Sequence, residues 1–439
     1  MDSGLTRSVR RPAIPSSIAD APISRARRTY ALIMFSLVSM LAVVDRHVLS
    51  VLVAPIQQEL NVNDTAMGLL SGVAFALFYA IAAIPVARYA DRGNRRNLLA
   101  VALTVWSAAT VMCGVAASYA QLLLARIGVA AGESAANPTM MSLIGSMYPR
   151  DGRASAIGVM FAGSAIGMFL GSALAGLLND LYGWRVAFMA IGAPGILLAL
   201  VICLSVPEPR RAVDDAVRGT EAQEPVSSVL RYLLSIRTFL PLLVAKCFFN
   251  MAFFSFLAWV PTLLIRSHQM TTAQMGLLFG TAFGIGGLLS NLAGGMASDR
   301  LARRGTRWYM YFCSTASCIA IPSLIAILWA QSSAFIFAGC LCFAVTGGLT
   351  VGPSLAAGLA VVRPQTHAFM TAVMYFCMNL VGAGLGPLLI GAASDAIRPT
   401  FGDHSLKFAL TIIAVELSIA AWMFFRASRV IERDASGSA

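Results

Sequence analysis

Charged side chains that interrupt long apolar runs are the residues of this sequence best suited to chemistry. Asp45 and Arg46 stand in one run, Arg126 and Glu133 in another, and Lys246 in a third. A charge at the centre of a lipid bilayer costs about 2.5 kcal/mol or more unless it is paired or faces water. These groups are therefore expected to act on a substrate or an ion, with carboxylates carrying protons and guanidinium groups binding anions.

The spacing of four of these residues predicts that they meet. Arg126 and Glu133 are seven residues apart, which places both on one face of a helix. A rise of about 1.5 Å per residue puts Asp45 at a similar depth in its own helix. We predict that Asp45 and Glu133 carry protons when an arginine partner moves away, with Arg46, Arg126 and Asn137 as substrate ligands or switching partners. The alternative is a static structural network.

Three further ionisable residues in apolar runs are weaker candidates. His47 adjoins the first pair and is a candidate proton shuttle, or else a packed polar group. Lys246 lies about 12 Å inside its run, so it either touches substrate or extends back to the membrane surface. Glu416 lies in the last run, which is expected to pack outside the transport cavity, and is given no role.

The elements that carry these residues are predicted to be twelve transmembrane helices. The chain has 439 residues, of which 58% are hydrophobic and 12% charged, where a soluble domain has about a quarter charged. A helix of about 20 apolar residues crosses the hydrocarbon core. The apolar runs lie at about 29–53, 65–90, 97–118, 120–147, 154–179, 185–206, 238–265, 272–298, 308–330, 333–362, 366–394 and 405–427.

The runs fall into two sets, which predicts an all-α membrane protein of two pseudo-symmetric six-helix bundles. The bundles are expected at residues 29–206 and 238–427, joined by a cytoplasmic linker at 207–237. A basic cytoplasmic tail at 1–28 and a second tail at 428–439 complete the chain. Such a duplicated arrangement suits alternating access, in which one half rocks against the other around a central site.

The distribution of Lys and Arg predicts the orientation of the chain. Most of the 32 basic residues fall in the tails and in alternate loops on one side, whereas the other side has only Arg185, Arg266, Arg398 and Lys407. Positively charged loops stay in the cytoplasm. We therefore expect a multi-pass protein of the cytoplasmic (inner) membrane with both termini cytoplasmic, and no nucleic-acid partner despite the net charge of +12.

Two predicted cytoplasmic loops, in corresponding positions of the two halves, repeat an acidic and basic pattern. They contribute Asp91, Arg92, Arg95 and Arg96 in the first half, and Asp299, Arg300, Arg303 and Arg304 in the second. The pattern resembles the major facilitator signature G-x-L-x-D-R-x-G-R-R, with Ala87 and Asn94 in place of glycines. We predict a cytoplasmic gate latched by these charges; a simple basic anchor is the alternative. Asn94 is expected to keep the turn by tolerating left-handed geometry.

Small residues recur at four-residue spacing in the fifth run. Gly163, Gly167 and Gly171 form one face that lets another helix approach closely. The ladder resembles an antiporter-associated motif, and ordinary helix packing is the alternative.

Four segments together resemble the spinster-like branch of the major facilitator superfamily, as found in bacteria. They are Val44-Asp45-Arg46-His47, Gly68-Leu69-Leu70, Arg126-Ile127-Gly128-Val129 with Gly132-Glu133-Ser134, and Gly183-Trp184-Arg185. The resemblance implies that the Asp-Arg pair of the first helix and the Arg and Glu of the fourth are functional. It also implies a lysolipid-like or sphingolipid-like substrate. Organic-anion symporters for sugar acids share the Asp-Arg pair and the Asn-Pro of the fourth helix.

These observations favour a secondary active transporter, proton-coupled, that moves an amphipathic or organic anion by alternating access. A sugar-acid symporter and a multidrug efflux antiporter are the alternatives, and a receptor or scaffold is disfavoured by the two loop motifs. The sequence shows no phosphate-cradling loop, metal-ligand cluster or nucleophile set, so no enzyme activity, cofactor or metal is expected. The expected partners are the substrate, protons and membrane lipid, and the protein is expected to be a monomer.

Overall fold

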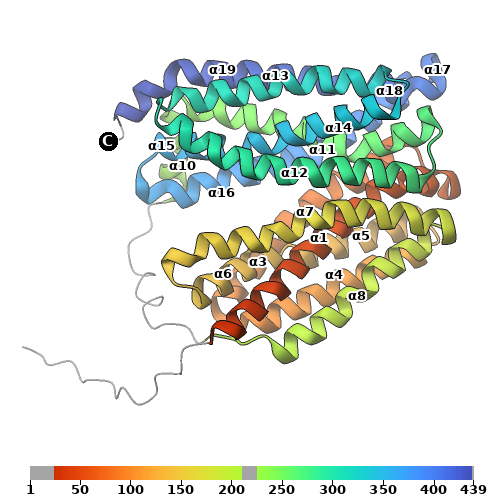
Figure 1. The fold of residues 1–439 in the computed structure, drawn as a ribbon, viewed down its shortest axis with the longest axis horizontal. Helices are drawn as coiled ribbons and strands as arrows, with labels where there is room; N and C mark the ends of the chain where they lie inside the picture. Colours follow the sequence, from red (N-terminus) through yellow and green to blue (C-terminus); the bar gives the residue numbers. More distant parts are fainter. Residues whose placement is uncertain (1–23, 210–224, 438–439) are drawn as a thin grey trace, which may run out of the picture.

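The computed structural model describes residues 24–209 and 225–437, which form helices and connecting turns. Figure 1 shows two groups of long helices lying side by side, and we call α1 to α8 the N-terminal half and α10 to α19 the C-terminal half. Within the described residues, ten stretches are long and apolar enough to cross a membrane. One of them, Phe369–Ala435, holds two crossings, and the broken pair α5 and α6 supplies another. The twelve predicted crossings are thereby all present as helices.

The crossings of the N-terminal half have these bounds: α1 Arg25–Leu60, α2 Asp64–Ser71 with α3 Val73–Arg92, α4 Arg95–Val115, α5 Tyr119–Glu133 with α6 Ala136–Met147, α7 Arg150–Tyr182 and α8 Trp184–Ser205. The C-terminal half begins with the short α10 Val226–Ser235. Its crossings are α11 Phe239–His268, α12 Thr272–Ala302, α13 Arg307–Trp329, α14 Ser333–Leu349 with α15 Val351–Ala360, α16 His367–Cys377 with η4 Met378–Leu385 and α17 Gly386–Phe401, and α18 Ser405–Ala409 with α19 Ile412–Gly437.

Several crossings are interrupted where the sequence indicated continuous runs. The fourth breaks between Glu133 and Ala136, the tenth at Thr350, and the eleventh contains the π-helical stretch η4. A proline lies shortly after each interruption, at Pro138, Pro353 and Pro387. Because proline has no N–H to donate and its ring crowds the carbonyl four residues earlier, these sites loosen the regular hydrogen-bond ladder.

Asn94 keeps the turn between α3 and α4 in a different way from the predicted one. Its φ is −78° rather than positive, and its side chain accepts a hydrogen bond from the backbone N–H of Asn97 at 2.8 Å. Asn94 is therefore the N-cap of α4, a position that favours Asn over Gly. The expectation of a left-handed residue was wrong because the side-chain cap satisfies the helix end.

The glycine ladder of α7 packs directly on α1. A Cβ atom added at Gly163 or Gly167 would overlap the backbone carbonyl oxygen of Ser36 or Met40, and one at Gly171 would lie 2.9 Å from the Cα of Val44. Backbones can approach this closely only when the side chain is a hydrogen atom. The ladder therefore fixes α1, the helix that carries Asp45 and Arg46, against α7.

The two halves are bonded to each other at one end of the molecule. We call the end opposite the termini the far end; it is the right-hand end in Figure 1, where α17 and α18 lie. Hydrogen bonds join the halves at the far end, from α1, α2 and α7 to α11, α12 and α17.

Candidate transport site

An ion pair between two helices of the N-terminal half forms the centre of the site. The Nε of Arg46 on α1 donates to the Oε1 of Glu133, the last residue of α5, at 2.6 Å. The Glu133 side chain is 3% exposed, whereas that of Arg46 is 34% exposed. The pair thus joins a buried carboxylate to an arginine side chain that is one-third exposed, and a guanidinium group can bind carboxylate or phosphate.

Two aromatic rings of α3 flank this guanidinium group. The Cζ of Arg46 lies 5.2 Å from the ring centre of Phe75 and 5.5 Å from that of Tyr79. The Tyr79 hydroxyl also interacts with Arg46 and with Asn137 of α6. The sequence analysis missed Phe75 and Tyr79. Their spacing of four residues, which places both rings on one helical face, was the signal that could have found them.

Arg126 and Asp45 lie behind the accessible pair and are each 2% exposed. The Nη1 of Arg126 donates to the backbone carbonyl oxygen of Asp45 at 3.2 Å, and its Cζ lies 5.2 Å from the ring centre of Phe75. The structure therefore brings together the four side chains predicted to meet. The sequence left open which arginine pairs with which carboxylate, and in the structure Glu133 pairs with Arg46 on another helix.

One oxygen of the buried Asp45 carboxyl group has no hydrogen-bond partner in the described structure. The carboxyl group faces Trp106 and Thr110 of α4, yet its Oδ1 makes no hydrogen bond within the described residues, and neither does the Trp106 Nε1. An ionised carboxylate buried without hydrogen bonds or an ion pair is costly, whereas a neutral carboxylic acid is much less so. Asp45 is thus placed where a bound proton would be stabilising.

The weaker candidates lie apart from this centre. His47 is 7% exposed and packs beside Gly171 of α7, and its Nδ1 has no partner in the described structure. Lys246 is 2% exposed, with its Nζ 5.5 Å from the ring centre of Phe249. Its side chain is therefore enclosed within the protein and does not extend to the membrane surface. Glu416 of α19 is also buried, at 2% exposure.

An aromatic cluster fills part of the C-terminal half. Phe256 of α11 stacks on Phe343 of α14 with ring centres 3.8 Å apart, and on Phe279 of α12 at 6.3 Å. Phe253 packs against the same ring of Phe343 at 6.1 Å. The cluster of four charged side chains lies in the N-terminal half, whereas the stacked phenyl rings lie in the C-terminal half.

The predicted gate residues are only partly described. The side chains of Asp91, Arg92 and Asp299 lie outside the described part of the structure. The side chains of Arg300, Arg303 and Arg304 are exposed, and Arg304 lies over the ring of Trp308. The cytoplasmic gate stays a prediction.

Arg95 instead is buried against the linker. Its Nε pairs with Glu208 at 3.1 Å and its Nη1 donates to Ser146 of α6 at 2.7 Å. The other carboxylate oxygen of Glu208 accepts from the backbone N–H of Arg96 at 2.6 Å. Glu208 therefore ties the start of α4 to the end of α8.

A polar cluster at the far end was not predicted from the sequence. We call it the far-end cluster. The Asp64 carboxylate accepts hydrogen bonds from Arg266 at 2.9 Å, Gln57 at 2.8 Å and Ser394 at 2.7 Å, and is 2% exposed. Asp395 in turn accepts from the backbone N–H of Thr65 at 2.7 Å, at the start of α2. The cluster joins α1 and α2 to α11 and α17.

Comparison with known proteins identifies the family of the chain. A sequence model of the Major Facilitator Superfamily matches residues 35–429. The chain belongs to this superfamily. As a major facilitator protein it is a multi-pass membrane transporter of small molecules and not an enzyme.

Relatives of this major facilitator protein differ in substrate. An MFS-type efflux pump of Mycolicibacterium smegmatis is 30% identical over 417 residues, with 93% of this chain and 94% of the pump covered. A probable L-galactonate transporter of Escherichia coli is 27% identical over 433 residues, with 91% of each chain covered.

A solved structure shows the same fold. A bacterial homolog of the human lysosomal transporter Spinster, crystallised in an inward-facing and unoccupied conformation, matches with a TM-score of 0.83 and 28% identity. The match covers 94% of this chain and 99% of that one. The predicted all-α major facilitator fold and the spinster-like resemblance are therefore confirmed.

Proposed function

We propose that this major facilitator protein is a proton-coupled carrier of an organic anion that has an apolar portion. The observation that carries the proposal is the accessibility of Arg46 within a buried charge cluster. Its side chain is 34% exposed while Asp45, Arg126 and Glu133 are at most 3% exposed. An anionic group of the substrate can reach Arg46, and the rings of Phe75 and Tyr79 beside it provide apolar contact.

Coupling follows from competition for Arg46. In this conformation the Glu133 carboxylate is bonded to the guanidinium group of Arg46, so a substrate anion must displace Glu133. A proton taken up by Glu133 removes its negative charge and weakens its hold on Arg46. The anion then replaces the carboxylate, and proton and substrate occupy the site together. In this scheme Asp45 holds a second proton, and Arg126, bonded to the backbone of Asp45, is the switching partner.

The polar groups beside Arg46 also support the sugar-acid alternative. Tyr79 and Asn137 interact with each other next to the guanidinium group, and hydroxyl groups of a sugar acid could hydrogen-bond to both. The name of the Escherichia coli relative points to such a substrate. The name of the mycobacterial relative points to efflux, for which the geometry of Arg46 requires an anionic rather than a cationic compound.

The deciding experiment measures uptake into liposomes with an imposed pH gradient. We offer a lysophospholipid, galactonate and the lipophilic cation ethidium to the wild type, and to the Asp45→Asn and Glu133→Gln variants. Wild type is expected to accumulate the lysophospholipid in response to the gradient. Both variants are expected to lose gradient-driven accumulation. Galactonate accumulation would establish the sugar-acid alternative, and ethidium transport without either anion would overturn the anion proposal.

A matched control separates proton coupling from general damage. Asp403→Asn removes a carboxylate that is exposed in the short η5 helix, Gly402–His404, outside the site. It is expected to transport like wild type. Glu133→Gln should retain exchange of substrate across the membrane without a gradient, because Arg46 is then free. Unchanged pH dependence in Asp45→Asn would contradict the coupling role of that residue.

The topology that goes with this function is also part of the proposal. We place the protein in the cytoplasmic membrane as a monomer, with both termini and the 207–237 linker cytoplasmic. The six-helix bundles at 29–206 and 238–427 would then rock about the site. Fusion of a cytoplasm-dependent fluorescent reporter to the C-terminus should give signal, and a reporter active only outside the cytoplasm should not.

A further inference from the structure

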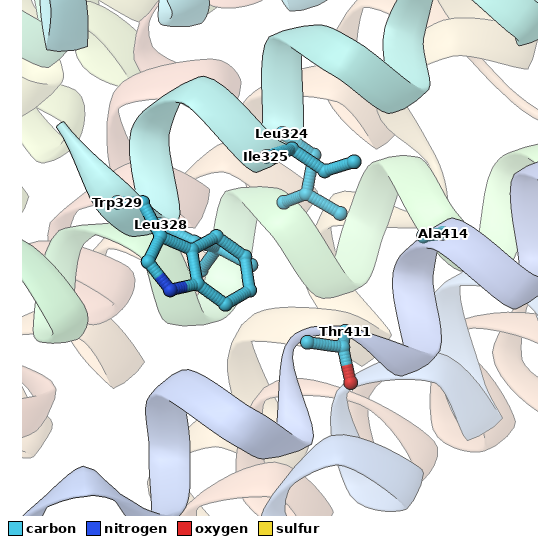
Figure 2. A pocket seen from close by; sticks show the side chains of 6 residues that line it. All are labelled: Leu324, Ile325, Leu328, Trp329, Thr411 and Ala414. Atoms are coloured by element: carbon cyan, nitrogen blue, oxygen red, sulfur yellow. The ribbon is translucent and has the colours of Figure 1, made fainter.

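A groove crosses the outer edge of the C-terminal half, far from the charge cluster. It lies between the last turns of α13 and the start of α19 and has a volume of about 330 Å³. Its lining residues are Leu324, Ile325, Leu328, Trp329, Thr411 and Ala414. Figure 2 shows the Trp329 indole and the Thr411 side chain on the two helices that border this space. A cavity of roughly 150 Å³ already holds a benzene ring, so the groove accommodates a stretch of hydrocarbon chain.

The walls of the groove are almost entirely apolar, and the indole of Trp329 and the hydroxyl of Thr411 are their only polar side-chain groups. Thr411 has the one hydroxyl group among the lining residues, and this hydroxyl donates to the carbonyl oxygen of Phe408 in its own helix at 2.6 Å. A buried water needs two to four polar partners, so water is a poor occupant of such a space. An apolar occupant fits better.

The helix break between α18 and α19 helps to shape the groove. Leu410 and Thr411 form a turn in which the N–H groups of Thr411, Ile413 and Ala414 bond to carbonyls three residues earlier. This tighter winding separates Ala409 from Ile412, and Thr411 and Ala414 line the groove from that point. Lys407 lies in α18, shortly before this turn.

The positively charged side chain of Lys407 lies beside the groove. The Nζ of Lys407 lies 5.2 Å from the ring centre of Trp329, which borders the groove. Within the described chain, Lys407 forms no ion pair with a carboxylate. Its charge is therefore available to an external anion, and the Trp329 ring orients it.

The position of the groove matches the boundary between lipid tails and headgroups. In Figure 1, α13 and α19 form the edge of the C-terminal half that lies away from the N-terminal half. Trp329 is the last residue of α13 and its side chain is 51% exposed. Trp and Lys side chains at helix ends characteristically lie at the membrane interface, where acyl chains meet charged headgroups.

We infer that this groove binds an anionic diacyl phospholipid of the surrounding membrane. One acyl chain lies in the apolar channel between α13 and α19, and the headgroup phosphate pairs with Lys407. The lipid is a stable part of the C-terminal half rather than transported cargo, because the groove opens on the face away from Arg46.

The test is native mass spectrometry of the purified, delipidated protein titrated with phosphatidylglycerol or phosphatidylcholine of identical acyl chains. Wild type is expected to bind phosphatidylglycerol about fivefold more tightly, the factor expected for one basic side chain at the interface. Lys407→Gln should reduce this ratio to about one. Ala414→Phe, which fills the groove, should weaken binding of both lipids.

Arg398→Gln is the matched control. Arg398 is exposed at the same far end, near the end of α17, but does not line the groove. Its substitution should leave the lipid preference unchanged. Equal binding of the two lipids to wild type would overturn the inference, and so would an unaltered preference in Lys407→Gln. Because the readout is lipid mass rather than transport, it stands independently of the proposed function.

Discussion

Arg46 contacts a carboxylate, a phenyl ring and a phenol ring. The planar shape of its guanidinium group is as important for these contacts as its charge. Its guanidinium group donates to Glu133 while its plane faces the rings of Phe75 and Tyr79. A lysine ammonium group cannot donate in the same fork geometry or stack in the same way. A guanidinium group favours anions that accept two parallel hydrogen bonds, such as carboxylate and phosphate, and our proposal expects such a group in the substrate.

Arg46→Lys is expected to lower the apparent affinity for the substrate anion by about tenfold, because a charge-assisted hydrogen bond is lost. The measurement is the substrate concentration for half-maximal uptake in proteoliposomes. Arg398→Lys, at an exposed position, supplies the control. Retention of wild-type affinity in Arg46→Lys would show that substrate binding depends on the positive charge alone and not on the guanidinium geometry.

Glu416 provides a second prediction from a single side chain. In the described structure neither of its carboxylate oxygens forms a hydrogen bond, although the residue is 2% exposed. Replacing a buried, unsatisfied polar group with an apolar one of similar size removes a desolvation penalty of about 1 to 3 kcal/mol. Glu416→Leu is therefore expected to raise the melting temperature of the detergent-purified protein. A marked decrease would mean that Glu416 has a partner in the working protein.

The residues of the site and their depth in the membrane could be predicted from the sequence, because a charged residue is easily recognised within an apolar run. Asp45, Arg46, Arg126 and Glu133 were found in this way. Their pairing could not be predicted, since it depends on how far each helix is rotated about its axis. The rotation of α1 about its axis decides whether Arg46 or Asp45 faces Glu133, since consecutive residues are about 100° apart, and the sequence of α1 does not specify that angle.

At the scale of elements, the contact between α1 and α7 determines that angle. Gly163, Gly167 and Gly171 each face the α1 backbone one turn further along. The ladder was predicted as either a packing face or an antiporter motif, and its contacts support the packing interpretation. Any side chain on this face would move α1, and with it the ion pair.

Gly167→Ala is expected to destabilise the protein by about 1 to 3 kcal/mol, as overpacking typically does. A Cβ at Gly167 would overlap the carbonyl oxygen of Met40. The control lies on the same helix, since a Cβ at Gly158 meets nothing within 4 Å. Gly158→Ala should be neutral or stabilising by about 1 kcal/mol, because Ala is the better helix former. Equal melting temperatures of the two variants would refute the close-packing argument.

The helix interruptions were only partly predictable. Pro138, Pro353 and Pro387 follow interrupted segments, yet Pro194 of α8 and Pro261 of α11 lie inside continuous helices. Proline removes one hydrogen bond in either case. Whether the helix then breaks depends on the neighbouring helices, which the local sequence does not describe.

For the whole molecule, the far-end cluster joins the two halves. Asp64, Arg266 and Ser394 belong to three different helices, and each looks like an ordinary polar residue in the sequence. These residues come together only when the two halves pack against each other, so the far-end cluster could not be predicted from the sequence. The opposite conformation must give up all of these bonds.

Asp64→Asn is expected to favour opening of the far end, because it removes the charge that holds Arg266. Hydrogen exchange followed by mass spectrometry should show faster exchange in peptides covering α2 and α17. Glu59→Gln is the matched control, since Glu59 pairs with Arg185 at the same end but within the N-terminal half. Similar exchange in the two variants would show that the cluster does not hold the halves together.

The π-helical stretch Met378–Leu385 sets the direction in which the rest of the eleventh crossing faces. A π-helical turn contains one residue more than an α-helical turn, and one residue corresponds to about 100° of rotation. Deleting a residue there, such as Val381, would restore α-helical winding and turn α17 about its axis. Ser394 and Asp395 would then point away from Asp64 and Thr65. The extra residue in η4 thus determines which face of α17 is turned toward α2 of the N-terminal half.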